Sequence, residues 1–177
     1  MATEGPASGG PDKPPGEFQR AIESRGEFQA AVRQLISAAA STGARQMWWV
    51  SPDFDDWPLE DAALLDILTG WVRSSAAVHV TWLADDFEPL RRRMPRLVRW
   101  RQTWAHVLNC GAPVERGASD LPSLLLVEGA GVLQMFDRVH WRGRISNTRP
   151  DLGQAREQID ALLQRSEPSF PVTTLGI

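Results

Sequence analysis

The chain has 177 residues, a net charge of −3 at pH 7 and a single cysteine, Cys110. This length suits one domain with one hydrophobic core, one cysteine excludes an intrachain disulfide framework, and the acidic balance argues against a protein built mainly to neutralise phosphate backbones. Arginine supplies every basic residue except Lys13, so the folded part lacks the lysine that Schiff-base chemistry or a P-loop requires.

The N-terminal sequence MATEGPASGGPDKPPG is rich in proline, glycine and small polar residues, and it contains no apolar run that could serve as a signal peptide. We therefore expect a disordered tail over residues 1–19 and a single folded domain over 20–167. No later segment has the run of apolar residues that a membrane span requires. These features predict a cytoplasmic protein that does not engage membranes.

Helices and strands alternate in the first part of this domain. A first helix should follow Ser24 and Glu27, which have the spacing of a capping box. The apolar runs 46–51 and 78–84 predict two buried strands with a helical apolar pattern between them, and an arginine-rich helix is expected over 87–108. This order predicts an α/β fold with parallel β-α-β units and helices packed on the sheet.

The pattern changes in the second part of the domain. Two short apolar runs, 123–128 and 131–136, are separated by a glycine-rich turn and predict a hairpin, and 138–147 is expected to add another strand. Thr148, followed by a proline and an acidic residue, has the signals that start a last helix. We expect the proline-rich segment 168–177 to be extended.

Acidic residues follow both strands of the first part. If those strands are parallel, the acids meet at one edge of the sheet, where several carboxylates could hold Mg²⁺. Such a metal site would make the protein a metal-dependent phosphohydrolase that uses Asp53, Asp55, Asp85 and Asp86, and we call this the metal-dependent alternative. The competing interpretation is that these acids cap the helices that follow, because each cluster precedes a proline that suits a first helical turn.

A basic stretch with interleaved tryptophans offers a third candidate function. Its members are Arg91, Arg92, Arg93, Arg96, Arg99 and Arg101, with Trp100 and Trp104. Such a stretch could bind nucleic acid, or it could be a solvated helix face with its tryptophans in the core. The histidines of this part of the chain, His79 and His106, have no cysteine or histidine at zinc-ligand spacing and are interpreted as structural.

The order of elements resembles a phospholipase D-like domain. The resemblance covers residues 20–167 and includes an apolar strand that ends in an acid and a glycine, Glu128 and Gly129, and a glycine and an asparagine just before a terminal helix. The chain looks most like a bacterial offshoot of that superfamily in which the fold persists without the catalytic motif. The resemblance implies an α/β fold with a mixed sheet flanked by helices.

Active members of that superfamily carry H-x-K-x-x-x-x-D on one strand and Gly-Ser-x-Asn on a following strand. At matching spacing, the histidine position is Leu121, the lysine position Ser123 and the aspartate position Glu128, while the second segment falls near Gly143 to Asn147. Leucine has no nucleophilic lone pair and serine has no positive charge, so the resemblance implies that the phosphohistidine route is closed at this strand.

A rival alignment places a degenerate site one strand later. His140, Arg142 and Asn147 reproduce the spacing of a histidine, a basic residue and an amide in place of the acid. If this region binds a ligand, His140, Arg142 and Arg144 suit a phosphate or another anion better than they suit a reaction.

The sequence therefore predicts a catalytically silent phospholipase D-like domain that serves as a binding or interaction module and needs no cofactor. Family members with one catalytic half pair two halves across a face, so the resemblance also implies a homodimer. A protein partner or a phosphate-containing ligand remains open as the binding target.

Overall fold

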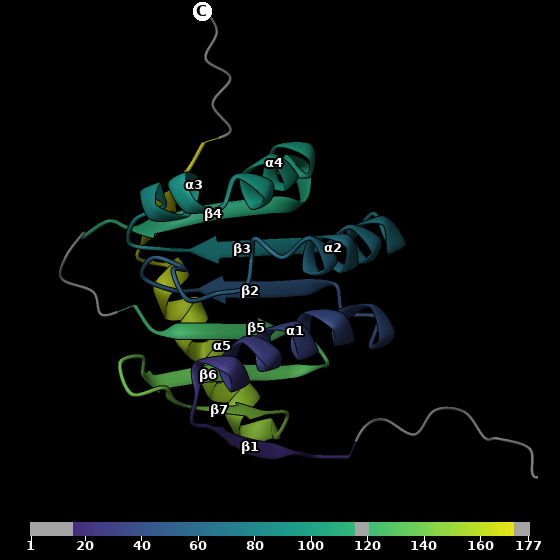
Figure 1. Cartoon of the computed structure of the whole chain (residues 1–177), viewed down its shortest axis with the longest axis vertical. Coiled ribbons are helices and arrows are strands. Elements are labelled where there is room, and N and C mark those ends of the chain that lie inside the picture. Colours follow the sequence, from purple (N-terminus) through teal and green to yellow (C-terminus); the bar gives the residue numbers. More distant parts are fainter. Residues whose placement is uncertain (1–15, 116–120, 172–177) are drawn as a thin grey trace, which may run out of the picture.

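The computed structural model describes residues 16–115 and 121–171, which form one eight-stranded sheet flanked by helices (Figure 1). The strands are β1 Gln19–Ile22, β2 Gln46–Val50, β3 His79–Leu83, β4 Leu108–Pro113, β5 Ser123–Val127, β6 Gly131–Asp137, β7 Arg142–Ser146 and β8 Ser166–Pro168. The helices are α1 Arg25–Ser41, α2 Ala62–Ser74, α3 Glu88–Arg93, α4 Pro95–Thr103 and α5 Arg149–Leu163, with one 3₁₀ turn at Ala105–Val107.

The sheet is mixed, with strand order β1-β7-β6-β5-β2-β3-β4-β8. Only the β2–β3 and β3–β4 pairs are parallel, and every other neighbouring pair is antiparallel. The helices between β2, β3 and β4 supply the crossovers that parallel pairing requires. The predicted α/β class, with a mixed sheet flanked by helices in one domain, is confirmed.

Two apolar clusters cover the two faces of the sheet. The larger one joins the inner sides of α1, α2 and α4 to alternate residues of the strands, including Met47 and Trp49 of β2. The smaller one joins α5 to the intervening residues, Trp48 and Val50. Because successive residues of a strand point to opposite faces, this alternation shows that β2 is buried on both sides. We refer to the two sides as the α1 face and the α5 face.

Three strands were not predicted. They are β1, β4 and β8, which lie at or next to the edges of the sheet. Part of the expected helix 87–108 is also different: it divides into α3 and α4 at Met94, its end forms the 3₁₀ turn, and its last residue, Leu108, begins β4. Pro95 explains the break, because proline disfavours helical geometry at the preceding residue, and Met94 has φ −125° and ψ 63°.

At both ends of the described chain, residues outside the range 20–167 pair or pack with the sheet. Residues 1–15 of the predicted tail lie outside the described part, but Phe18 packs against the large core cluster and Gln19 begins β1. In the predicted extended segment, Pro168 pairs with Gly111 of β4, and Phe170 is buried. Arg101 holds this end of the chain, since its guanidinium donates to the carbonyl oxygen of Phe170 and lies 4.3 Å from the centre of that ring.

Segment 51–61 between β2 and α2 is folded around aromatic side chains. Phe54 has φ 59°, which is unusual for a residue with a side chain, and its ring is fully buried 5.1 Å from Trp57. Trp49 stacks on Trp82 at 5.1 Å between ring centres, next to Trp57. The indole nitrogens of these three tryptophans are buried and have no hydrogen-bond partner among the described residues.

No helix of the described residues is both long and apolar enough to cross a membrane.

Candidate functional site

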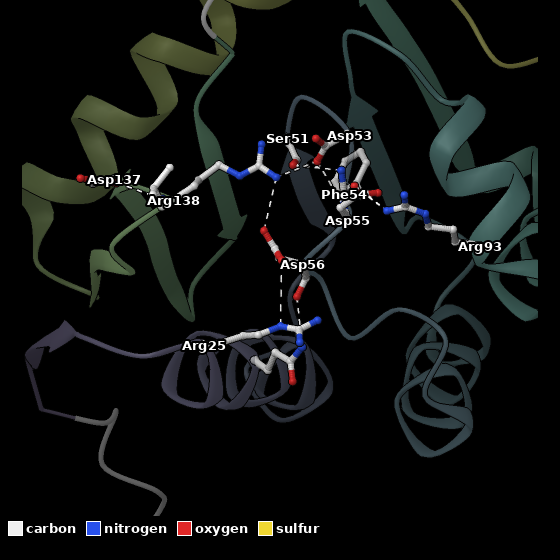
Figure 2. A network of polar contacts seen from close by, with 11 residues as sticks. Arg25, Ser51, Asp53, Phe54, Asp55, Asp56, Arg93, Asp137 and Arg138 are labelled. Carbon is white, nitrogen blue, oxygen red and sulfur yellow. Dashed lines mark hydrogen bonds and ion pairs between the residues drawn. The ribbon is translucent and has the colours of Figure 1, made fainter.

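The acidic residues after β2 lie at the carboxyl edge of the parallel strands, as predicted, but arginines pair with them. Arg138, in the turn after β6, donates to Asp53 at 2.7 Å and approaches Asp56 at 3.5 Å (Figure 2). Arg93 lies 2.6 Å from Asp55, and Arg25 lies 4.0 Å from Asp56. We call these six residues, Arg25, Asp53, Asp55, Asp56, Arg93 and Arg138, the Asp-Arg network.

The second acidic cluster lies beside the first. The backbone N–H groups of Asp85 and Asp86 both donate to the carbonyl oxygen of Pro52, so the two strand ends touch. The side chain of Asp86 accepts the backbone N–H of Glu88 at 2.8 Å, at the start of α3. Asp86 thus bonds the first N–H of α3 from the position before the N-cap, which is Phe87 and makes no side-chain cap.

The capping interpretation is wrong for the first cluster. Helix α2 begins at Ala62, and its N-cap is Asp61, whose carboxylate accepts the N–H of Ala63 at 3.0 Å. Asp61 also accepts a hydrogen bond from Arg33 at 3.1 Å, and this bond holds the pKa of the carboxyl below its usual value. Segment 51–61 is not helical, because it places Phe54 and Trp57 in the core. The N-cap of α2 therefore lies several residues later in the chain than the sequence pattern predicted.

The geometry at the carboxyl edge does not support the metal-dependent alternative. In the described part of the chain, no three histidine, cysteine, aspartate or glutamate side chains are placed to hold a metal ion together. Each arginine of the Asp-Arg network supplies a positive charge where Mg²⁺ would otherwise neutralise the carboxylates. Asp53, Asp55, Asp85 and Asp86 come to one edge of the sheet without forming such a group.

The residues at the family's first motif lie along β5. Leu121 is 5% exposed in the apolar cluster under α5, and Ser123, the first residue of β5, is 4% exposed. Glu128 follows the other end of the strand, where its carboxylate accepts the N–H of Arg45 at 3.3 Å. The backbone N–H of Glu128 donates to the carbonyl oxygen of Gln46. Glu128 therefore joins the hairpin turn to the start of β2.

The two residues assigned to the second motif have packing and anchoring contacts. A side chain at Gly143 would collide with the sulfur of Met135 and the carbonyl oxygen of Gln134, so only glycine fits next to β6 here. The amide oxygen of Asn147 accepts the N–H of Phe18 at 2.6 Å, and its nitrogen donates to the carbonyl oxygen of Gly16 at 3.3 Å. Asn147 thus fastens the chain leading into β1 to the end of β7.

The candidate anion-binding residues are paired with separate acids. The imidazole of His140 lies 2.7 Å from Asp137, and hydrogen bonds from the backbone and the ring of His140 lower the pKa of that carboxyl. Arg142 approaches Glu23 at 3.5 Å, at the start of the β7 strand. His140 lies in the turn before β7, so the three residues of the rival alignment do not share one strand.

Arg144 is the most buried of these basic groups. Its guanidinium donates to Asp151 at 2.7 Å, and the Asp151 side chain is only 10% exposed. Hydrogen bonds from Ser146 and Thr148, together with the charge of Arg144, hold the pKa of Asp151 below its usual value. This pair locks the start of α5 to β7 and leaves little of Arg144 for a ligand.

The arginine-rich stretch is also mostly engaged within the protein. Arg101 is buried, Trp100 is 7% exposed and donates to Thr69 at 3.0 Å, and Arg96 approaches Glu60 at 3.9 Å. Glu88 lies 3.4 Å from Arg91 and 4.0 Å from Arg92. Among the described residues only Arg99 of this stretch has a side chain with neither an ion pair nor a hydrogen bond, since Arg101 is held by Cys110 and Phe170. The exposed arginines therefore do not form a continuous unpaired surface.

Sequence reasoning missed a hollow on the α5 face, at the amino ends of β2, β3 and β4. It has a volume of about 300 Å³ and is lined by Gln46, Trp48, His79, Thr81, Asn109 and Arg156. We call it the polar hollow. Its residues are scattered over 111 positions and make no motif, and only the strand register brings them together.

Neither a protein family model nor a curated protein matches the chain. Two phospholipase D family structures match it over their whole length: Nuc from Salmonella typhimurium, with a TM-score of 0.55, 10% identity and 88% of this chain covered, and NucT from Helicobacter pylori, with a TM-score of 0.54, 9% identity and 87% covered. This chain has a phospholipase D-like fold.

The phospholipase D-like fold is also similar to part of a larger protein. The structure of TrmBL2, described as an archaeal chromatin protein with a novel mode of DNA binding, matches 89% of this chain with a TM-score of 0.60 and 11% identity. The chain spans only 56% of TrmBL2. At such low identities these likenesses concern the fold alone.

Proposed function

We propose that this chain is a phospholipase D-like domain without phosphodiesterase activity that works as a binding or interaction module. One observation carries the proposal: the position assigned to the family's nucleophile is Leu121, which is buried in an apolar cluster with Leu124 and Ala155. A buried hydrocarbon side chain can neither attack phosphorus nor take a proton, so the covalent step has no reactive atom at this position.

A phosphodiesterase assay tests the silent site. We expect purified protein to release no nitrophenolate from bis(p-nitrophenyl) phosphate above the buffer rate, and His140→Ala to behave identically. Turnover that disappears in His140→Ala, and persists in the matched surface variant His106→Ala, would contradict the proposal.

We propose further that the module forms a homodimer through the β6–β7 hairpin. Phe136 and Val139 support this surface, because they are 64% and 81% exposed, and Met135 beside them pairs with Ser123 at the start of β5. Large apolar side chains that stand this far into solvent on one hairpin are candidates for a protein contact, although the guanidinium of Arg144 lies 5.5 Å from the centre of the Phe136 ring. The dimer implied by the family resemblance would use this same end of β5.

Light scattering after gel filtration tests the dimer. We expect the mass of two chains for the wild type and of one chain for Phe136→Ser. Ile67→Ser is the matched control, since Ile67 is 38% exposed on α2, away from the hairpin. A wild-type monomer, or equal loss of dimer in both variants, would refute the surface.

We also propose a cytoplasmic location, which the free, partly buried Cys110 supports, because thiols are kept reduced in the cytoplasm and disulfides form in oxidising compartments. Nucleic-acid binding through the arginine-rich stretch is the weaker alternative. The DNA binding stated for TrmBL2 belongs to that protein, and here the arginines are held by acids of the same chain.

A further inference from the structure

The polar hollow lies on a grid that the strand register defines. Gln46 is the partner of His79 in the β2–β3 pair, and Thr81 lies between Trp48 on β2 and Asn109 on β4. Residues two apart on one strand point to the same face, and neighbouring strands lie about 4.8 Å apart. These five side chains therefore stand in two adjacent rows on the α5 face, within the span of one small molecule.

Helix α5 covers Trp48 in these rows and leaves the other four side chains outside its apolar cluster. It packs on residues at the carboxyl ends of the strands, Val50 and Leu83, and only Arg156 reaches the hollow. In Figure 1 the strands β2, β3 and β4 run side by side in one direction, with the helix crossing behind the sheet. The amino ends of these strands thus form the floor of the hollow, and α5 forms one wall.

Four polar side chains of the hollow have no partner in the part of the chain that the structure describes. Gln46, His79, Thr81 and Asn109 make no side-chain hydrogen bond or ion pair to any described residue. Gln46 and Thr81 are half-buried, while His79 and Asn109 are exposed. The hollow therefore presents free hydrogen-bonding groups, in contrast to the paired charges at the opposite end of the same strands.

The chemistry of these groups indicates what they would recognise. A neutral amide, hydroxyl or imidazole offers both a donor and an acceptor, as does each hydroxyl group of a polyol. None of the described residues that line the hollow is a carboxylate, and the one arginine among them, Arg156, is paired with Asp160 at 3.3 Å. This composition provides no unpaired charge for a phosphate or an ammonium group, and many matches for uncharged hydroxyls.

The tryptophan of the hollow does not offer a stacking surface. Trp48 is 5% exposed, and the guanidinium of Arg156 lies 4.3 Å from the centre of its ring. A nucleobase that needed an open aromatic face would find this one covered. A volume of about 300 Å³ is at the lower end of the range for small-molecule sites.

We propose that the polar hollow binds a small uncharged polyol of the size of a monosaccharide. Gln46, His79, Thr81 and Asn109 hydrogen-bond its hydroxyl groups, and Arg156 closes one side. This site shares no residue with the silent β5 position or with the hairpin surface. The polyol proposal can therefore fail while the proposed function holds, and the reverse.

Amide chemical shifts of the full chain, followed during titration, test this site. The probes are D-glucose, D-galactose and myo-inositol, with inorganic phosphate and AMP as chemically different ligands. We expect at least one polyol to shift the amides of β3 and β4 around Thr81 and Asn109, with a Kd of about 1–10 mM, as suits a ligand of this size.

Variants decide whether the shifts come from the hollow. Thr81→Val keeps a β-branched strand residue, and it should weaken the bound polyol about threefold to tenfold through loss of one hydrogen bond. Asn109→Ala, at an exposed position, should do the same and serves if Thr81→Val folds poorly. Thr103→Val on α4 is the matched control and should leave the Kd unchanged.

Three results would overturn the proposal. They are the absence of shifts at the hollow with all three polyols, shifts that are equally weakened by Thr103→Val, and binding at the hollow of phosphate or AMP but of no polyol. The last result would assign the hollow to anions or bases.

Discussion

The two ends of the parallel strands differ in how their polar side chains are used. At the carboxyl end of β2, three carboxylates pair with three arginines. These arginines belong to α1, to α3 and to the turn between β6 and β7. At the amino end, two amides, a hydroxyl and an imidazole line a hollow and have no partner in the described chain. The clusters that are most conspicuous in the sequence are therefore the least available, and the scattered neutral residues are the most available.

The difference has a physical origin. Charges brought together at a strand edge must be neutralised if the fold is to be stable, and an arginine from a neighbouring element can do this without a ligand. Neutral amides and hydroxyls at a solvated surface need no internal partner, because water satisfies them until a ligand replaces it. Paired side chains should thus contribute to stability, whereas unpaired ones should contribute to binding.

The largest effect is expected at Asp151, the most deeply paired carboxylate. Asp151→Asn keeps the shape but removes the charge that Arg144 and Thr148 contact, so we expect the free energy of unfolding at pH 7 to fall by about 2 kcal/mol. Urea unfolding measures this change. Asp66→Asn, an exposed α2 position, is the matched control, and an equal loss in both would show that the pairing contributes nothing.

The lowered pKa of Asp151 also makes the stability of the protein depend on pH. Because the pKa of Asp151 is lower in the folded protein than in the unfolded chain, its stabilisation is complete above the unfolded pKa and is lost as the pH falls through the folded value. Wild-type stability should therefore decrease more steeply than that of Asp151→Asn below about pH 4. Parallel curves for the two proteins would exclude this role.

A smaller effect is expected at the Asp-Arg network. Arg138→Met leaves Asp53 and Asp56 without their shared cation, and since these side chains are about one third exposed, the loss should be about 1 kcal/mol. Arg99→Met is the control, because Arg99 has no ion pair among the described residues. Thermal or urea unfolding should separate the two variants, and identical stabilities would show that the pairing is only geometric.

Almost no stability change is expected at the polar hollow. Thr81→Val and Asn109→Ala change side chains that have no partner among the described residues, so each should change the free energy of unfolding by less than about 0.5 kcal/mol. Urea unfolding in buffer without sugars measures this. A loss as large as that of Arg138→Met would mean that these residues support the fold and would remove the contrast between the two ends.

The smallest effect is expected from metal ions. Arginines already neutralise the carboxylates at the carboxyl edge, so Mg²⁺ or Mn²⁺ should not raise the melting temperature above a NaCl control of equal ionic strength. A true site, saturated at one hundred times its Kd, would add about 2.7 kcal/mol and could not be missed. A clear upward shift, abolished in Asp53→Asn, would restore the metal-dependent alternative.

Local sequence patterns predicted the elements that are buried and strongly periodic. The runs at 46–51 and 78–84 became β2 and β3, the capping box became the start of α1, and Thr148 became the N-cap of α5. The strand β4 has the sequence LNCGAP, in which asparagine, glycine and proline are poor strand formers, and it is a strand because β3 pairs with it.

The sites were less accessible to sequence reasoning than the fold. The aspartates could be placed at one edge from strand direction alone, but their partners Arg25 and Arg138 are far away in the chain and follow no spacing rule. His79 was interpreted as structural, yet its ring is exposed next to Gln46. Register between strands decides which residues share a surface, and a single sequence does not contain it.

The tryptophan cluster gives the protein an internal optical probe. The Trp49 and Trp82 rings are stacked in the core beside Trp57, and the three indole nitrogens have no hydrogen-bond partner in the described chain. Indoles in such a dry environment emit at shorter wavelengths than solvated ones, and stacked indoles couple their electronic transitions. The tryptophan emission should therefore shift to longer wavelengths on unfolding. The circular dichroism of the stacked Trp49–Trp82 pair should be lost at the same denaturant concentration.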